Sequence, residues 1–322
     1  MMREKIEDPT KSEFEMLRAQ ELACLGREAR YLYLSGLELT AQSNNTTQDI
    51  SQQLPTHLPL HGPLPKPFEG KEYKILAPLV FTQIVLRFIG QRRCFGFIAE
   101  PLEAKRQNQE IFIVYRGSQT VWDWVSNFRI FQTKERLFPS PNDPNYGIRG
   151  EVHRGFNDQY TRPDRKRKQP SISEIVESTL TPEIVNNRTI YVAGHSLGGA
   201  LATLTAAHIK HRYPNAQVCL YTTASPRVGD DRFEEFFRSQ QIDAFRIYNQ
   251  YDLVPKLPPR FESPFEAAQY VHVGDPIPFT HRANSLEFKH TLPIYACALN
   301  LDPEAFNYLD GNKSLPFSCS LP

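Results

Sequence analysis

The sequence of 322 residues lacks both a strong charge of either sign and a long apolar run. Its 37 lysine and arginine residues nearly balance 36 aspartate and glutamate residues, which leaves a formal net charge of +1. Because a broad basic surface is missing, nucleic acid is not an expected partner. No stretch approaches the roughly 18–20 consecutive apolar residues that a membrane-spanning helix needs, so we expect no transmembrane segment.

An apolar export signal is also missing from the first residues, Met1 to Asp8, most of which are charged. A secretory signal needs an apolar stretch of about 7–15 residues after a positively charged start. On this ground we expect a cytoplasmic protein.

Cysteine is scarce, since the chain has five, an odd number that cannot all pair with one another. The absence of a Cys-x-x-Cys pair argues against a zinc site and against a dithiol redox centre. Cys94, Cys219 and Cys297 have apolar neighbours, which predicts buried free thiols that act as small hydrophobic side chains.

An apolar stripe of helical spacing marks the first part of the chain. Leu22, Leu25, Ala29 and Leu32 recur at intervals of three and four residues, which indicates one apolar face of a helix. We expect residues 1–41 to form an N-terminal helical arm that docks on the main body.

Proline is concentrated in the next part of the chain, residues 42–72. Each proline fixes φ and removes a backbone donor, so we expect an extended, proline-rich linker there. Residues 73–322 then form the predicted catalytic domain.

Short apolar runs rich in β-branched residues recur through this domain. They cover residues 75–81, 84–88, 94–99, 111–115, 189–193, 218–222, 244–248 and 270–273. Helical stretches at residues 197–211 and 231–238 lie between several of them, so the pattern predicts an α/β fold with a mostly parallel central sheet flanked by helices. Functional groups of such sheets lie at the carboxyl ends of the strands.

The most informative segment is Gly194-His195-Ser196-Leu197-Gly198, which joins a β-rich run to a helix of small residues. The Gly-x-Ser-x-Gly pattern is typical of a tight, strained turn that presents a serine hydroxyl and places the following backbone N–H at a helix N-terminus. A glycine-rich turn with a capping serine is the plain structural alternative.

A serine nucleophile needs a histidine base and an orienting carboxylate, which follow in the order Ser, Asp, His in hydrolases of this type. Asp252 comes just after the predicted strand 244–248, where such an acid belongs, and Asp275 is the weaker alternative. His281 and His290 both lie in predicted loops, and spacing does not choose between them; His272 is expected within a strand.

A second oxyanion donor should lie where an earlier strand meets a loop. The apolar run 111–115 is followed by Arg116-Gly117-Ser118, a glycine that permits close approach and then a hydroxyl.

Six motifs in one order resemble the class 3, fungal-type triacylglycerol lipase family of the α/β-hydrolase superfamily. They are Tyr115-Arg116-Gly117-Ser118, Val152-His153-Arg154-Gly155-Phe156, the segment from Gly194 to Ala200, Ser225-Pro226-Arg227-Val228-Gly229, the segment from Asn249 to Pro255, and the segment from His290 to Tyr295. The match spans residues 111–295, so the arm and the linker lie outside it.

The resemblance implies an α/β-hydrolase fold with the triad Ser196, Asp252 and His290, and it favours His290 over His281. It assigns Ser118 and Leu197 to the oxyanion hole. It implies no metal and no organic cofactor, and it leaves His153 with a packing role near the site.

Members of this family carry a short lid helix directly after the oxyanion serine. Here Val121, Trp124, Val125 and Phe128 would share one helical face. We therefore expect a lid and substrate-binding segment that contains Val121, Trp122, Trp124, Val125 and Phe128. The alternative is a helix fixed in the core.

The leading hypothesis is a serine hydrolase that cleaves carboxylic esters of lipids as an acylglycerol lipase, with transient contact to a lipid surface. Phospholipase A1 and an esterase of soluble esters are the alternatives within this class. A lipase-like binding or signalling protein without turnover is the alternative from another class, and the complete Ser–Asp–His set argues against it.

Overall fold

The computed structural model describes residues 15–42, 55–60, 68–86, 89–107, 109–118, 132–133, 150–166, 168–260, 270–282 and 285–307. The helices are α1 (Met16–Gln42), α3 (Arg154–Thr161), α4 (Ile172–Thr179), α5 (Pro182–Val185), α6 (Leu197–Arg212), α7 (Asp231–Ser239), α8 (Leu286–Lys289), α9 (Leu292–Ala298) and α10 (Glu304–Asn307), with a 3-10 turn at Val254–Lys256. The strands are β1 (His57–Pro59), β2 (Glu72–Leu86), β3 (Ile89–Pro101), β4 (Glu110–Tyr115), β5 (Gln132–Thr133), β6 (Val152–His153), β7 (Thr189–His195), β8 (Gln217–Thr223), β9 (Asp243–Asn249) and β10 (Asp275–Phe279).

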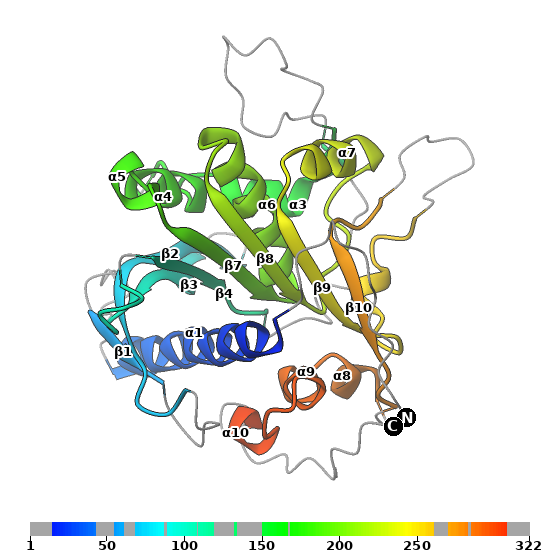
Figure 1. Ribbon diagram of the computed structural model, residues 1–322, viewed down its shortest axis with the longest axis horizontal. Coiled ribbons are helices and arrows are strands. Elements are labelled where there is room, and N and C mark those ends of the chain that lie inside the picture. Colours follow the sequence, from blue (N-terminus) through cyan, green and yellow to red (C-terminus); the bar gives the residue numbers. More distant parts are fainter. Residues whose placement is uncertain are drawn as a thin grey trace.

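One large sheet organises these elements, in the strand order β1-β2-β3-β4-β7-β8-β9-β10 (Figure 1). The first four strands pair antiparallel, and β4, β7, β8, β9 and β10 pair in parallel. The carboxyl ends of the parallel strands therefore meet along one edge of the sheet, which is where ligands bind in sheets of this kind.

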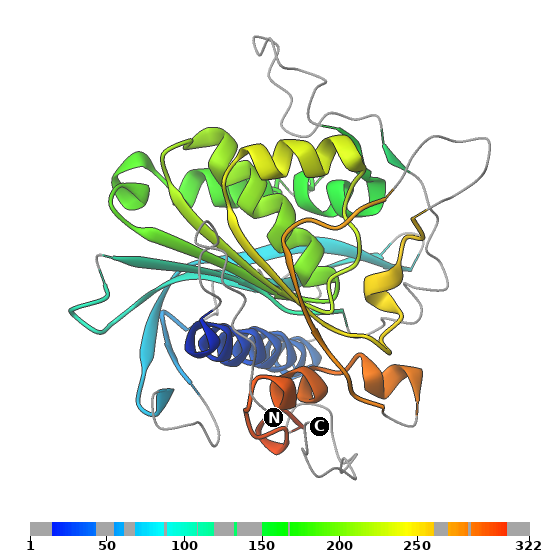
Figure 2. The same cartoon turned by 45° about the vertical axis from the view of Figure 1, so that its right-hand side comes forward.

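Helices cover both faces of the sheet (Figures 1 and 2). On one face α3, α4, α6 and α7 contribute to an apolar cluster, and the central helix α6 is buried along nearly its whole length. On the other face α1, α9 and α10 form a second cluster with the opposite sides of the strands. The predicted sheet flanked by helices is confirmed.

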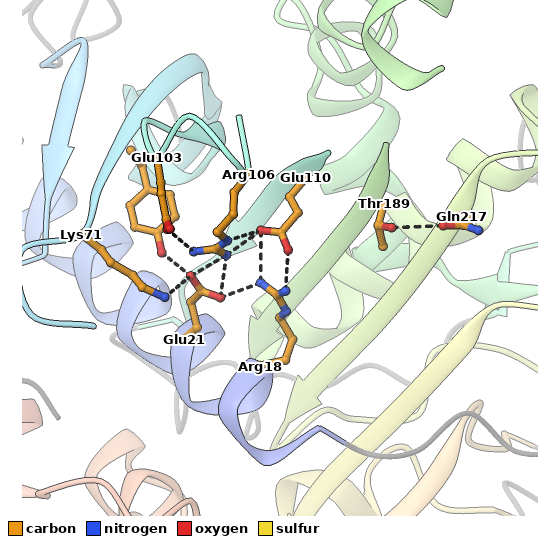
Figure 3. A network of polar contacts seen from close by, with 9 residues as sticks. Arg18, Glu21, Lys71, Glu103, Arg106, Glu110, Thr189 and Gln217 are labelled. Atoms are coloured by element: carbon orange, nitrogen blue, oxygen red, sulfur yellow. Dashed lines mark hydrogen bonds and ion pairs between the residues drawn. The ribbon is translucent and has the colours of Figure 1, made fainter. Parts of the chain in front are cut away.

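Helix α1 lies against β3, β4 and β7 through the predicted stripe, whose members Leu22, Leu25, Ala29 and Leu32 are all buried. A buried carboxylate, Glu21, adds polar contacts to this apolar packing (Figure 3). It receives hydrogen bonds from Tyr73 and Arg106 and pairs with Arg18 at 2.6 Å.

The same network reaches the first residue of β4. Arg18 and Arg106 both bind Glu110, at 2.6 Å and 2.5 Å respectively (Figure 3). Arg18 also lies 3.9 Å from the centre of the Tyr191 ring on β7. Charges from the arm and from the β3–β4 turn thus neutralise one another at the start of the central strands.

Two strand predictions need correction. The predicted strand 270–273 is a loop with one bridge at Val271, and β10 lies at Asp275–Phe279 instead. Prolines at two of its five positions argue against a strand in the sequence pattern. The strand forms nevertheless, because an edge strand tolerates residues without N–H groups. The run 75–81 and residues 84–86 of the next run form parts of one long strand, β2, since no turn residue separates them.

The prediction of a buried free thiol is confirmed for Cys94; Cys219 is free but only partly buried, and Cys297 is in a disulfide. The apolar neighbours of Cys297 in the sequence indicate that it is buried, but they do not indicate which distant residue lies beside it. The expected linker also contains a short strand, β1, which pairs with β2 at the edge of the sheet. No described helix combines the length and the apolar character needed to cross a membrane.

Candidate active site

The predicted nucleophile, Ser196, lies in a tight turn between β7 and α6. Its φ of 57° and ψ of −126° are strained values for a residue with a side chain. The glycines around it allow the turn, because a Cβ on Gly194 would lie 2.1 Å from the Gly198 carbonyl oxygen, and one on Gly198 would lie 2.4 Å from the Arg116 oxygen. The Ser196 N–H donates to Thr223 on β8, which fixes the turn to the neighbouring strand.

The structure brings the three predicted triad residues together. His290 Nε2 lies 2.8 Å from Ser196 Oγ, and His290 Nδ1 lies 2.7 Å from Asp252 Oδ2. They come from the β7–α6 turn, from the loop after β9, and from the end of α8. The residues are 0%, 1% and 4% exposed for Ser196, Asp252 and His290 respectively, so their hydrogen bonds form out of contact with water.

Three donors hold the Asp252 carboxylate. Tyr295 on α9 donates its hydroxyl to Oδ2 at 2.7 Å, beside the bond from His290, and the Val254 N–H donates to Oδ1 at 2.9 Å. Burial, reinforced by the charge of Asp252, raises the pKa of the Tyr295 hydroxyl, so it remains a proton donor at neutral pH. The carboxylate is thereby held at a fixed angle to the imidazole.

The Asn249 side chain joins the loops that carry the acid and the base. Its amide nitrogen donates to the carbonyl oxygens of His281 and Lys289, and its oxygen accepts from the N–H groups of Tyr251 and His281. The Asn249 N–H in turn donates to the Tyr295 hydroxyl. Asn249 and Tyr295 were not predicted as site residues, although their fixed spacing to Asp252 and His290 within two of the motifs is the signal that marks them.

The segment with the predicted oxyanion residue Ser118 passes beside the nucleophile. A Cβ on the preceding Gly117 would lie 3.0 Å from the His195 ring, a tight contact, and 3.5 Å from Ser196 Cβ, so a side chain here would press on the His195 ring. Arg116 anchors the segment by donating to the carbonyl oxygens of Cys94 and Gly117. Leu197, the second predicted oxyanion residue, is the first residue of α6, where N–H groups lack partners within the helix. The oxyanion roles of Ser118 and Leu197 stay predictions.

Other candidates lie away from this centre. Asp275 starts β10 opposite Phe245, near the beginning of β9, whereas Asp252 follows the end of that strand. His281 contributes its backbone to the Asn249 contacts, and a ring nitrogen of His272 binds the Pro255 carbonyl oxygen. His153 caps α3 by accepting from the Gly155 N–H and packs against Phe156, which agrees with a packing role.

The predicted lid residues Val121, Trp122, Trp124, Val125 and Phe128 lie outside the described residues. The turn from Ser225 to Gly229 supports the acid loop: the Arg227 guanidinium donates to the carbonyl oxygens of Lys256 and Pro258. Within the part of the chain that the structure describes, no cluster of three or more metal-binding side chains occurs.

A strained serine between a parallel strand and a buried helix, with an acid and a histidine from later loops, defines the α/β-hydrolase superfamily. The comparisons with known proteins agree with this class and narrow it. Residues 112–262 match the family model of class 3 lipases. This segment, slightly less than half of the chain, is therefore similar to class 3 lipases.

Individual relatives cover only part of the chain. A lipase of Rhizomucor miehei is 31% identical over 169 residues, which are 51% of this chain and 40% of that protein. The chloroplastic phospholipase A1-Igamma1 of Arabidopsis thaliana is 28% identical over 253 residues, 67% of this chain and 47% of that protein. The chain thus spans less than half the length of these two relatives.

A solved structure supports the fold. The lipase from Rhizopus microsporus var. chinensis has a TM-score of 0.52 and 21% sequence identity, over 85% of this chain and 80% of that chain. At this identity the likeness bears on the fold alone, which is the predicted α/β-hydrolase fold.

Proposed function

We propose that this protein is a serine hydrolase that cleaves carboxylic esters of lipids through an acyl-enzyme intermediate. The observation that carries the proposal is the continuous hydrogen-bond chain from Ser196 through His290 to Asp252 in a buried site. Such a chain allows a hydroxyl, which is a weak nucleophile at its own pKa, to react at neutral pH.

In the first half of the reaction His290 Nε2 takes the Ser196 proton while Oγ attacks the ester carbonyl carbon. The carbonyl oxygen becomes an oxyanion, which the backbone N–H groups of Leu197 and of the Ser118 segment stabilise. His290 then gives its proton to the alcohol oxygen, which leaves, and the acyl group remains on Ser196. Asp252 stabilises the imidazolium that forms in between.

In the second half a water molecule gives a proton to His290 and attacks the acyl-enzyme. The proton returns from His290 to Ser196 Oγ as the carboxylic acid departs. The residues require no metal or organic cofactor for either half.

The substrate class follows from the relatives, which are named lipases and phospholipases A1. We propose acylglycerols as the first substrate and place phospholipids second. The phospholipase A1 relative is the specific support for the second, since its match covers more of this chain than the match to the Rhizomucor lipase does.

The test is hydrolysis of p-nitrophenyl esters from C2 to C16, followed by triacylglycerol emulsions and phospholipid vesicles. Ser196→Ala should lower turnover by about 10⁴-fold or more, because the nucleophile is lost. Ser178→Ala, which changes an exposed serine hydroxyl on α4, should keep the wild-type rate. A folded wild-type protein that hydrolyses none of these esters would favour the binding protein instead.

A further inference from the structure

His195 is a half-buried histidine that the triad mechanism does not use. It ends β7, directly before Ser196, and its ring lies against the ring of His290 with centroids 5.0 Å apart and planes at 36°. The His195 and Tyr295 rings pack edge to face with centroids 5.4 Å apart, and a Cβ on Gly117 would lie 3.0 Å from the His195 ring. One side chain thus touches the base, the residue that holds the acid, and the oxyanion segment.

Polar contacts fix the His195 ring. Its Nδ1 lies 3.1 Å from the hydroxyl of Thr223, the last residue of β8, and a second hydrogen bond joins the side chain to the backbone of His290. Because β7 and β8 pair at these two positions, the ring is held by the rigid part of the sheet.

The surroundings keep this ring uncharged. Burial lowers the pKa of His195 well below its usual value, and the adjacent His290 and Arg30 of α1 lower it further, against the hydrogen bond to the His290 backbone. The ionisable groups that face it are therefore Arg30, His290 and Tyr295, with Asp252 beyond His290. Two adjacent imidazolium rings would repel each other, so a neutral His195 suits a His290 that becomes charged during turnover.

The arm closes the space behind His195. A small cavity of about 40 Å³ lies there, lined by Gly26 and Arg30 of α1, by Gly117 and by His195 itself. Helix α1 therefore packs behind both the oxyanion segment and His195.

The chemistry explains why His290 needs such a support. In the resting site its two nitrogens are held by Ser196 and Asp252. During each half of the reaction Nε2 must leave Ser196 Oγ and serve the alcohol oxygen or water. At that moment only Asp252 and the packing on the ring face determine where Nε2 points.

We propose that His195 is a positioning residue for His290. Its ring packs against the imidazole of His290 and keeps the orientation of Nε2 fixed while the proton moves between Ser196 and the leaving alcohol. This inference rests on the proposed ester hydrolysis. It concerns the ring face and not the polar contacts of the ring.

The experiment compares His195→Phe, which keeps a flat ring, with His195→Asn, which keeps a polar group near Thr223 but removes the ring. The measurements are kcat and KM for a p-nitrophenyl ester and the rate at which a p-nitrophenyl phosphonate labels Ser196, followed by mass spectrometry. We expect kcat and the labelling rate of His195→Asn to fall roughly 10²-fold, as for a misplaced catalytic group, with KM nearly unchanged. His195→Phe should recover most of this loss.

His208→Gln serves as the control, because it alters a buried histidine far along α6 and should leave kcat unchanged. Thermal unfolding of all variants separates a loss of fold from a loss of position. Equal losses in His195→Phe and His195→Asn, or wild-type rates in His195→Asn, would overturn the inference. If the proposed function is wrong, the wild-type protein would hydrolyse no ester. The labelling rates of Ser196 in the His195 variants would still test whether His195 positions His290.

Discussion

Several single residues have pKa values well below those that they would have in water. Besides His195, burial lowers the pKa of His208 to about 4 and, together with Arg246, that of His272 to about 3. His208 stays neutral although its Nε2 lies 2.9 Å from Glu177, and its Nδ1 binds the Tyr160 hydroxyl at 2.8 Å. His208 is buried, His195 and His272 are partly buried, and all three rings act as hydrogen-bonding groups within the fold.

This burial predicts how stability depends on pH. Below about pH 6.5 the unfolded chain binds protons at these histidines, whereas the folded protein does not until pH approaches their lowered pKa values. The free energy of unfolding should therefore be largest above pH 6.5 and fall on acidification toward pH 4. Each histidine contributes about 1.4 kcal/mol per pH unit within its window.

Urea unfolding at pH 7.5, 6 and 5 measures how the free energy of unfolding changes with pH. His208→Gln should reduce this slope by roughly the 1.4 kcal/mol per pH unit that one histidine contributes. His57→Gln, at an exposed position on β1, should leave the slope as in wild type. An unaltered slope in His208→Gln would show that His208 titrates alike in both states.

At the scale of elements, the strand–turn–helix around Ser196 depends on glycines for space and not only for flexibility. Gly194 meets the backbone of Gly198, and Gly198 meets the backbone of Arg116 on the oxyanion segment. Backbone atoms cannot rotate away as a side chain can. The turn, the start of α6 and the oxyanion segment therefore have to move together or not at all.

Gly194→Ala should destabilise the protein by about 2–3 kcal/mol or more and lower ester turnover, because the added methyl displaces the start of α6. Chemical denaturation and p-nitrophenyl ester kinetics measure the two effects. Gly26→Ala on α1 is the matched control, since its Cβ would lie 3.9 Å from Val114 Cγ1, an ordinary contact. This variant should raise the free energy of unfolding by about 0.5–1 kcal/mol, as expected when alanine replaces a glycine within a helix. Full activity in Gly194→Ala would contradict the argument.

At the scale of the whole molecule, α1 is packed as part of the main body. Its stripe is buried against the sheet, and Glu21 connects it to the β3–β4 turn and, through Arg18 and Arg106, to β4. Burial alone would raise the pKa of Glu21, but Tyr73 and the neighbouring cations lower it, so the carboxylate is charged. The division into an arm of residues 1–41, a linker of 42–72 and a domain of 73–322 stays a prediction.

Glu21→Gln should lower the free energy of unfolding by about 3 kcal/mol, because two half-buried guanidinium groups lose one of the two carboxylates that they share. If α1 unfolds with the sheet, circular dichroism and ester turnover should shift together along a urea titration. Glu103→Gln is the control: its carboxylate lies 3.8 Å from the same Arg106 but is 54% exposed, so the change should stay below about 0.5 kcal/mol. A shift in circular dichroism alone would show that the arm unfolds separately.

The sequence by itself determined what is local. The turn around Ser196 needs only a strand, two glycines and a helix within a few residues, so its place and its strain could be predicted, as could the buried stripe of α1 and most strands. The residues alone left His281 and His290 open, and the family resemblance favoured His290.

Tertiary structure decided what depends on contacts between distant segments. Three features of the site join segments that are 40 or more residues apart or lie on different elements. They are the hydrogen bonds of Asn249, the bond from Tyr295 to Asp252, and the packing of the His195 ring against His290. The disulfide of Cys297 was missed for the same reason, whereas strand β10 was missed because two prolines interrupt its local pattern. A side chain's neighbours along the chain report how apolar its surroundings are, but only the packed fold determines which distant atom lies within hydrogen-bonding distance.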